Sequence, residues 1–277
     1  MPCERPIILP NPKGGTLQAI CGTCRSCLIQ DIKDWSMRLQ IENKHAFNGY
    51  FVTLTYADPY NDDELHKEHL QDFIKTIRNL ADYKRKTALT NIPPIKYFGV
   101  GEYGEQELRP HYHILLFNVP EKTRSKALTF IQKAWDMGFV VIDEINKTTI
   151  EYVCKYIFKQ RYWNIKKQKP FRLMSTRPAI GSQYIDTHQD YHLKGEVFYR
   201  SEEGNKKHLP RFYTNKIFDD EYKERRREQA ELFGEKLREK AINTEAKENV
   251  QKTTKTIIYN DQKQQSFIRE IKRKKLN

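Results

Sequence analysis

The chain has 277 residues, of which 38% are hydrophobic and 31% are charged, and its formal net charge is +13 at pH 7. The low apolar fraction indicates that part of the chain stays outside a hydrophobic core. No apolar run approaches the roughly 20 residues that span a bilayer, and the N-terminus lacks the apolar region of a signal peptide. We therefore expect a soluble intracellular protein without a membrane partner, whose five cysteines are reduced.

The positive charge begins at residue 152. Residues 1–151 hold 19 Lys and Arg against 19 Asp and Glu, whereas residues 152–216 hold 14 against 5. A basic surplus alone is typical of a solvated surface. This one is interleaved with Tyr, Phe and Trp, and single-stranded nucleic acids bind where positive charge is combined with rings for base stacking. The composition therefore favours a nucleic-acid partner.

The first 48 residues are predicted to be an arm with a cysteine cluster, followed by a helix over residues 28–45. Three cysteines repeat at two-residue spacing in CGTCRSC, which lets thiolates share one tetrahedral zinc ion. The alternative interpretation is a set of unliganded thiols. An iron–sulfur site is disfavoured because the ferredoxin-type run has a fourth nearby cysteine followed by proline. The candidate zinc ligands are Cys3, Cys21, Cys24 and Cys27.

A core of strands and helices is predicted over residues 49–165. Runs of β-branched and aromatic residues indicate strands, and apolar residues spaced three and four apart indicate helices. The expected elements are a strand at 50–56, a helix at 65–80, a polar loop at 83–94, strands at 95–100 and 111–117, a helix at 122–136 and a strand at 139–145. This order predicts an α+β fold with a mostly antiparallel central sheet and helices on one face, in the manner of RNA-recognition and ferredoxin-like folds.

Three glycines, Gly99, Gly101 and Gly104, match the spacing of a dinucleotide-binding fingerprint. That fingerprint requires a helix directly after the glycines. Here only GEQELRP separates them from the next strand, so we predict that the glycines form a tight turn between two strands, with Glu102 at its start, and no dinucleotide site.

A His-x-His pair opens the strand at 111–117. Alternation along a strand places His111 and His113 on one face, about 6 to 7 Å apart along the backbone, where both imidazoles can reach one ion. A hairpin with the preceding strand would bring Glu102 beside them. Two nitrogens and one oxygen, with open positions for substrate and water, predict a divalent-metal site.

A helix with two tyrosines follows the last core strand, and Thr148 and Glu151 have the spacing of a capping box. At about 100° per residue, an apolar stripe that includes Cys154 lies on one side of this helix. Tyrosines on an amphipathic helix most often pack their rings against the core and keep their hydroxyl groups in contact with water. These two are predicted to lie off the stripe, which favours a chemical role. The residues predicted on the polar side are Tyr152, Lys155, Tyr156 and Lys159.

Two further parts complete the predicted organisation. Residues 166–216 are interpreted as a basic aromatic extension that lines a nucleic-acid groove, with short strands near 197–200 and 208–213, and residues 217–277 as a charged helical tail. The predicted domains are 1–48, 49–165, 166–216 and 217–277. The candidate DNA-binding residues are Arg161, Lys166, Lys167, Lys169, Arg172 and Arg177.

Several motifs occur together in one known family. They are MPC with CGTC, FVTLTY, GEYGEQELRPHYH, EYVCKYIFK, MSTRPAIG and HLPRFY, and they span most of the chain. With them the sequence resembles the HUH endonucleases, most closely the gokushovirus-type replication initiation proteins of microviruses, which are small single-stranded DNA bacteriophages. The sequence departs from the family at Tyr112, between the histidines, where the class name implies an apolar residue. We expect this side chain to point away from the metal.

The resemblance implies an HUH/RRM-like fold and a role in rolling-circle DNA replication. The protein would nick single-stranded origin DNA, form a 5′-phosphotyrosine intermediate and later rejoin the strand. The 3′-hydroxyl would serve a host DNA polymerase, working with a host helicase in the cytoplasm of the bacterial host. In this chain the Mg²⁺ or Mn²⁺ ligands would be His111, His113 and Glu102; Tyr152 and Tyr156 would alternate as nucleophiles, and Lys155 and Lys159 would favour the phenolate.

Two other interpretations stay open at this point. One is a plasmid initiator, relaxase or transposase of the same superfamily, in which only one tyrosine is essential. The other is a noncatalytic RRM-like nucleic-acid-binding protein with an incidental histidine pair. Separate Tyr152→Phe and Tyr156→Phe variants distinguish alternation from a single nucleophile, and a covalent protein–DNA band distinguishes both enzymes from the binding module.

Overall fold

The structure is a computed structural model. It describes residues 3–10, 14–88, 91–104, 107–161, 166–194, 198–201 and 204–225. Two compact units divide the chain, Met1–Ile217 and Phe218–Asn277. The predicted charged tail therefore coincides with the second unit, of which most lies outside the described residues. Among the described residues, no helix is both long and apolar enough to cross a membrane.

A five-stranded antiparallel sheet forms the centre of the first unit, with the strand order β6-β3-β5-β4-β7. Its strands are β3 (Gly49–Tyr56), β4 (Lys96–Tyr103), β5 (Pro110–Phe117), β6 (Gly138–Glu144) and β7 (Phe171–Met174). The predicted α+β class and the order of the core elements are confirmed. Gly99, Gly101 and Glu102 lie within β4, so the prediction that these glycines form the turn, with Glu102 at its start, is wrong: they are paired residues of a strand. The next element after β4 is β5 and not a helix.

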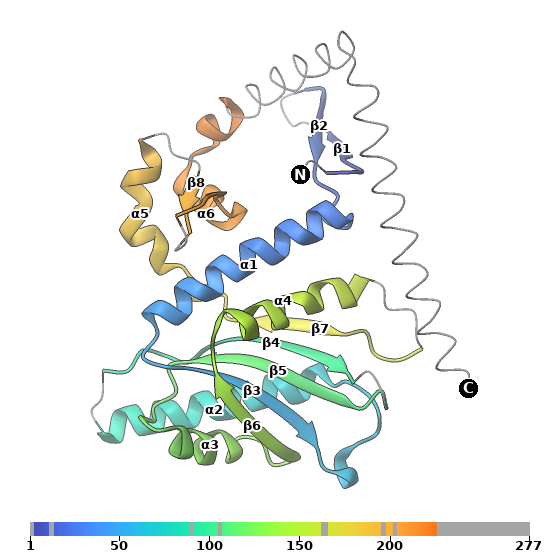
Figure 1. Cartoon of the computed structure of the whole chain (residues 1–277), viewed down its shortest axis with the longest axis vertical. Coiled ribbons are helices and arrows are strands. Elements are labelled where there is room, and N and C mark those ends of the chain that lie inside the picture. Colours follow the sequence, from blue (N-terminus) through green and yellow to red (C-terminus); the bar gives the residue numbers. More distant parts are fainter. Residues whose placement is uncertain are drawn as a thin grey trace. The chain divides into compact units, whose positions relative to one another are not determined.

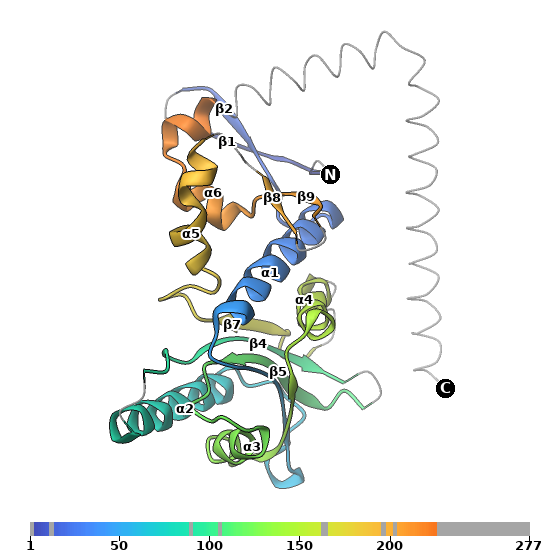
Figure 2. The same ribbon diagram turned by 60° about the vertical axis from the view of Figure 1, so that its left-hand side comes forward.

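One face of the sheet is covered by α2 (Lys67–Ala88) and α3 (Arg124–Gln132), as both views show (Figure 1, Figure 2). Phe73 and Ile77 of α2 pack with the fully buried Trp135 against this face. The polar loop predicted at 83–94 is wrong in its first part, because α2 continues through Ala88. An ion pair between Asp82 and Arg85 supports the end of the helix. The first proline after the start of α2, which could end the helix, is Pro93.

The other face is covered by α1 (Arg25–His45) and α4 (Lys147–Arg161), which lie side by side (Figure 2). Helices therefore pack on both faces, and the prediction of one covered face is wrong for the sheet as a whole. A second core cluster forms here, because α1 and α4 each turn apolar residues to the sheet. Its most buried members are Leu39, Phe98, Val100, Leu115, Phe117, Ile150, Val153, Cys154 and Ile180.

The start of α4 differs from the predicted capping box. Asn146 Oδ1 accepts a hydrogen bond from the backbone N–H of Thr149 at 3.0 Å, and Thr149 Oγ1 accepts one from the backbone N–H of Asn146 at 2.9 Å. This reciprocal pair is a capping box two residues upstream of the Thr148–Glu151 pair that the sequence favoured.

The residues after the core complete the first unit. They form α5 (Gln183–Leu193), the small hairpin β8 (Phe198–Arg200) and β9 (Lys206–His208), and α6 (Arg211–Ile217). The strand predicted at 208–213 is therefore wrong beyond His208, because the Pro210 carbonyl starts a helical turn by accepting from Tyr213 and Thr214. A buried ion pair between Glu42 and Lys96, 2.9 Å apart, ties this segment to the core, since Glu42 also accepts from the Gly181 backbone.

The N-terminal residues form a separate hairpin. It consists of β1 (Ile7–Pro10) and β2 (Thr16–Ala19) and precedes the cysteines at the start of α1 (Figure 1). A three-residue helical turn, η1 (Asp58–Tyr60), follows β3, where Asp58 and Pro59 were expected to break the strand.

Candidate metal and tyrosine site

The histidine pair and Glu102 converge on the sheet face that α4 covers. His111 and His113 are two residues apart on β5, so their side chains point to the same face of the sheet. Glu102 lies directly opposite His111 on β4. One ligand atom from each of the three residues lies within 4.8 Å of the others. The hairpin between β4 and β5 thus brings together the three side chains that the sequence proposed as metal ligands.

His111 is oriented by its own hairpin. Its Nδ1 lies 3.1 Å from the Arg109 carbonyl oxygen, so Nδ1 carries a proton and donates. Its Nε2 lies 2.9 Å from Oε1 of Glu102. A lone pair and a carboxylate oxygen approach this closely only with a shared proton or a cation at that point. The pair is therefore built to hold positive charge, which fits a metal ion bound through Nε2.

His113 is fixed from three directions. Its Nδ1 lies 3.0 Å from the hydroxyl oxygen of Thr53, and its Nε2 lies 3.1 Å from Oε1 of Glu102. The imidazole is stacked between Phe51, with ring centroids 5.3 Å apart, and Tyr156, at 5.8 Å. Metal-binding histidines are commonly held in one orientation by a hydrogen bond to the ring nitrogen that does not bind the metal, which here is Nδ1.

Glu102 is 3% exposed and remains ionised. Burial alone would raise its pKa, but hydrogen bonds from His111, His113 and Tyr156 outweigh burial and lower the pKa to about 2. A carboxylate that is charged and buried between two imidazoles attracts a cation strongly. The donor set of two imidazole nitrogens and one carboxylate oxygen suits Mg²⁺, Mn²⁺ and other divalent ions that accept mixed nitrogen and oxygen ligands.

Tyr152 reaches the edge of this site from α4. It is 38% exposed, and its hydroxyl oxygen lies 3.5 Å from Nε2 of His113. Its ring meets the edges of Phe51 and His113, at centroid distances of 6.0 and 5.2 Å. Tyr152 is therefore an exposed residue whose hydroxyl lies next to the candidate ligands.

Tyr156 differs from the sequence prediction. It is 3% exposed and belongs to the core cluster beneath α4, so the prediction that both tyrosines lie off the apolar side is wrong for this one. Its hydroxyl is hydrogen-bonded to Glu102, and burial, together with Glu102 and Tyr152, raises the pKa of Tyr156 far above its ordinary value. A phenol held this way stays protonated and donates to the carboxylate.

Tyr112, between the histidines, lies on the opposite face of β5. It is fully buried, and its hydroxyl oxygen lies 2.6 Å from that of Tyr56 and 2.9 Å from the His66 carbonyl oxygen. As the sequence predicted, a polar tip is accommodated here because it points away from the histidines and finds partners in the other core.

The predicted lysines and arginines have different surroundings. Lys155, Lys166, Lys169 and Arg177 are exposed. Lys167 donates to the Asp63 carbonyl, and Arg172 forms a 2.9 Å ion pair with Asp31 of α1, so part of the positive charge of Arg172 is already matched. The side chains of Lys159 and Arg161 lie outside the described residues, so their predicted roles stay predictions.

Two residues of the site were not singled out from the sequence. Thr53 and Phe51 lie on β3, with Thr53 directly opposite His113. The alternation of FVTLTY could have placed them on one face, but only the strand order shows that this face is the one that carries His113.

The four N-terminal cysteines also come together. The Sγ atoms of Cys3, Cys21, Cys24 and Cys27 lie within 4.8 Å of one another, while Cys154 lies on α4 and is buried in the core. The four candidate zinc ligands are thus the ones that the fold gathers, and Cys154 is not among them.

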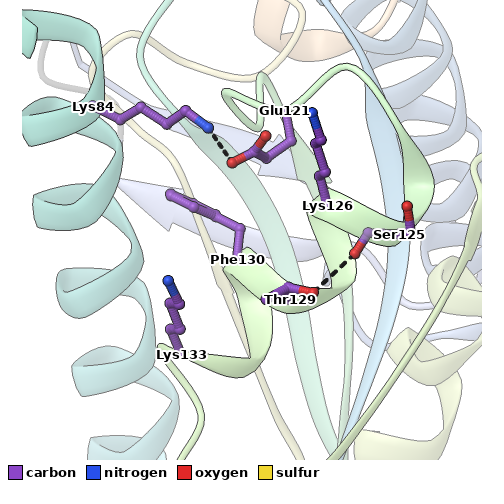
Figure 3. Close-up of a pocket in the computed structure, with 7 residues that line it drawn as sticks. All are labelled: Lys84, Glu121, Ser125, Lys126, Thr129, Phe130 and Lys133. Atoms are coloured by element: carbon purple, nitrogen blue, oxygen red, sulfur yellow. Dashed lines mark hydrogen bonds and ion pairs between the residues drawn. The ribbon is translucent and has the colours of Figure 1, made fainter. Parts of the chain in front are cut away.

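A hollow of about 430 Å³ lies between α2 and α3, on the face of the sheet opposite the histidines (Figure 3). It is lined by three lysines, with Lys84 paired to Glu121. Thr129 donates to the backbone of Ser125 at its rim. None of the candidate metal ligands or tyrosines contributes to it, so we assign it no part in the site.

Comparisons with known proteins agree with a replication role. The chain is 28% identical over 222 residues to replication-associated protein ORF2 of Spiroplasma virus 4, covering 72% of this chain and 66% of that protein. It is 27% identical over 213 residues to replication-associated protein VP4 of Bdellovibrio phage phiMH2K, covering 70% and 66%. The chain thus spans just under two thirds of the length of these relatives.

One solved structure is similar to part of the chain. It is hypothetical protein ORF119 of Sulfolobus islandicus rod-shaped virus 1, which aligns with 49% of this chain and 99% of its own length, at 19% identity and a TM-score of 0.27.

The family comparison covers the candidate site itself. Residues 49–161, which hold the histidine pair, Glu102 and both tyrosines, match the family of replication-associated proteins ORF2/G2P.

Proposed function

We propose that this chain is a replication initiation protein of the HUH type that nicks single-stranded origin DNA through a tyrosine nucleophile. The observation that carries the proposal is that the hydroxyl of an exposed tyrosine, Tyr152, lies next to a cluster of two histidines and one carboxylate. The family match over the same residues and the named relatives support it, since both concern replication.

His111, His113 and Glu102 would hold a divalent ion, Mg²⁺ or Mn²⁺. When bound, the ion polarises a phosphate and offsets the negative charge that develops during the reaction. The chain prepares the site for it: the Arg109 carbonyl and Thr53 orient the two rings, and Tyr156 and the histidines keep Glu102 ionised.

Tyr152 is the proposed first nucleophile, because this residue is 38% exposed while Tyr156 is buried and hydrogen-bonded to Glu102. The Tyr152 oxygen attacks the scissile phosphorus, a bond forms between them, and the bond from phosphorus to the 3′-oxygen breaks. The phenol loses its proton to solvent, and the departing 3′-oxygen gains one. The energy of the phosphodiester is kept in the phosphotyrosine bond, so the reverse attack by a 3′-hydroxyl rejoins the strand without ATP.

Tyr156 is proposed as the second nucleophile in alternating cycles, one helical turn from Tyr152. To act, its hydroxyl must leave Glu102, so its role depends on a rearrangement of this hydrogen bond. Its burial favours the alternative of a single-tyrosine enzyme of the plasmid-initiator, relaxase or transposase type, in which Tyr156 only positions Glu102.

The proposed setting is rolling-circle replication in the cytoplasm of a bacterial host. The nick leaves a 3′-hydroxyl, which a host polymerase extends while a host helicase separates the strands. Lys155 and Lys159 would lower the energy of the phenolate, and the basic residues after Arg161 would contact the DNA backbone.

The test uses single-stranded oligonucleotides tiled across the genome that encodes the protein, incubated with the full chain and Mn²⁺. We expect a covalent protein–DNA band on a denaturing gel that EDTA prevents. The double variant Tyr152→Phe/Tyr156→Phe should abolish the band, and Tyr83→Phe, which changes an exposed tyrosine of α2, should leave it unchanged. Equal residual bands from the Tyr152→Phe and Tyr156→Phe single variants would support alternation. Oligonucleotide binding without any band would reduce the protein to a nucleic-acid-binding module.

A further inference from the structure

The four N-terminal cysteines have the geometry of a tetrahedral metal centre. Cys3 Sγ lies 3.9 Å from Cys24 Sγ, and Cys21 Sγ lies 4.0 Å from Cys27 Sγ. Four sulfurs bound at about 2.3 Å to one zinc ion are about 3.8 Å apart, as the edges of a tetrahedron require. A disulfide needs sulfurs at about 2.05 Å, so these sulfur pairs are not disulfide bonds. The sulfurs are therefore spaced for a shared ion.

The backbone around the cysteines donates to the sulfurs. The N–H of Cys21 points to Sγ of Cys3 at 3.3 Å, and the N–H groups of Thr23 and Cys24 point to Sγ of Cys21 at 3.4 and 3.2 Å. Hydrogen bonds of this kind stabilise sulfur that carries negative charge, which is the form that binds metal. The turn at residues 21–24 thus provides an outer shell as well as ligands.

The cysteines join two elements that share little apolar surface. Cys24 and Cys27 belong to the start of α1, whereas Cys3 and Cys21 flank the hairpin β1–β2. All of β1 is exposed, and β2 alternates between exposed and half-buried residues. A two-stranded hairpin with so little burial is marginal in water. Besides the sulfurs, the Glu4 carboxylate accepts hydrogen bonds from the backbone and hydroxyl of Ser26, which also join this segment to α1.

We infer that Cys3, Cys21, Cys24 and Cys27 bind one structural zinc ion, which attaches the hairpin β1–β2 to the N-terminal end of α1. All four positions are filled by thiolates, so the centre is closed and takes no part in chemistry. It is separate from the histidine site in its ligands, which are soft sulfurs in one case and nitrogen and oxygen in the other. The site goes beyond the proposed nicking function and does not depend on it.

The centre is coupled to the rest of the fold through α1. The same helix contributes Ile32, Trp35 and Leu39 to the core cluster that contains Tyr156. Loss of zinc should therefore release the hairpin first and leave the core side of α1 packed. We expect chelation to increase hydrogen exchange in residues 7–19 more than in β3 to β5.

The direct test is the zinc content of the full chain, purified without added metal and measured by mass spectrometry. We expect about one zinc ion per chain. Cys21→Ser should lose it, while Cys154→Ser, a change at the cysteine outside the cluster, should keep it. The double variant His111→Ala/His113→Ala should also keep it, which separates this centre from the catalytic site even if nicking fails.

Cobalt titration keeps the test decisive if a cysteine variant does not fold. The metal-free wild-type chain should bind one Co²⁺ with the intense visible absorption of a tetrahedral thiolate complex, and added Zn²⁺ should displace it. Wild-type protein that contains no zinc and gives no such absorption would overturn the inference. So would zinc that persists in Cys21→Ser, or a coloured centre that contains iron.

Discussion

The Thr53 hydroxyl is the smallest feature on which the proposed site depends. It holds Nδ1 of His113, so that Nε2 faces Glu102. We expect Thr53→Val, which keeps the shape of the side chain, to weaken Mn²⁺ binding by about 10-fold, because removing an outer-shell partner costs this order of affinity. Isothermal titration of the full chain with Mn²⁺ measures it.

The matched control is Thr55→Val, two residues further along the same strand and opposite His111. Its affinity should equal that of the wild type. If both variants bind Mn²⁺ as the wild type does, the orientation of His113 does not matter for the ion, and the assignment of His113 as a ligand is in doubt.

At the scale of single residues, the metal ligands were predictable and the burial of Tyr156 was not. Side chains alternate between the two faces of a strand, so His111 and His113 share one face of the sheet whichever helices pack on it. A hairpin between the two strands brings Glu102 beside them. The side of a helix that is buried depends on the rotation with which it packs. Tyr156 lies three residues after Val153 on the edge of the apolar stripe, and the sheet beneath α4 takes it inward.

Among the elements, α4 carries both tyrosines, and its first turn depends on Asn146. We expect Asn146→Ala to lower the free energy of unfolding by about 1 kcal/mol, the usual cost of losing such a cap. Thermal unfolding followed by circular dichroism measures the change.

Thr148→Ala serves as the comparison for this cap. The sequence favoured Thr148 as the capping residue, but the structure places the reciprocal bonds at Asn146 and Thr149. A larger loss of stability for Thr148→Ala than for Asn146→Ala would show that α4 begins where the sequence indicated.

Edge strand β6 adds an exposed residue to the sheet face that carries the histidines. Phe139 is 64% exposed and lies opposite Thr55, which itself lies opposite His111, so its ring shares the face of the histidines. We expect a base next to the nick to stack on it. Phe139→Ala should then weaken the binding of single-stranded DNA by about 1 to 3 kcal/mol, or roughly 5-fold to 150-fold.

Fluorescence anisotropy with a labelled oligonucleotide measures this, in a Tyr152→Phe/Tyr156→Phe background so that no covalent bond forms. Phe47→Ala removes another exposed ring, just after α1, and should bind as the background does. Equal affinities for all three proteins would remove β6 from the proposed DNA path.

At the scale of the whole molecule, the charge asymmetry predicts where the DNA backbone runs. Lys166 and Lys169 are exposed in the segment between α4 and β7. We expect the double variant Lys166→Gln/Lys169→Gln to bind single-stranded DNA more weakly and with a shallower salt dependence. The logarithmic slope should fall by about 0.7 for each phosphate that the variant no longer neutralises.

The control for charge alone is Lys126→Gln/Lys133→Gln, which removes two lysines from the hollow on the opposite face. Its salt dependence should match that of the wild type. If both double variants reduce the slope equally, the DNA is attracted by net charge and not by a defined path.

The succession of strands and helices in the core, and its antiparallel sheet, could be predicted from the sequence, whereas the edge strand β7 could not. Two strand–helix–strand units with a tight hairpin between them leave few ways to form one antiparallel sheet. Strand β7 was not predicted, because FRLM is short and lies in a basic stretch. It forms by pairing with the free edge of β4, which no local pattern reports.

The proposed mechanism rests on the Tyr152 phenol as the group that attacks the DNA. The most direct measurement is mass spectrometry of the protease-digested covalent product formed with Mn²⁺ and a cleavable oligonucleotide. We predict a nucleotide-bearing peptide whose modification lies on Tyr152 in the first turnover. A first-turnover modification that lies on Tyr156 or outside α4, or no modification with any origin-derived oligonucleotide, would contradict this mechanism.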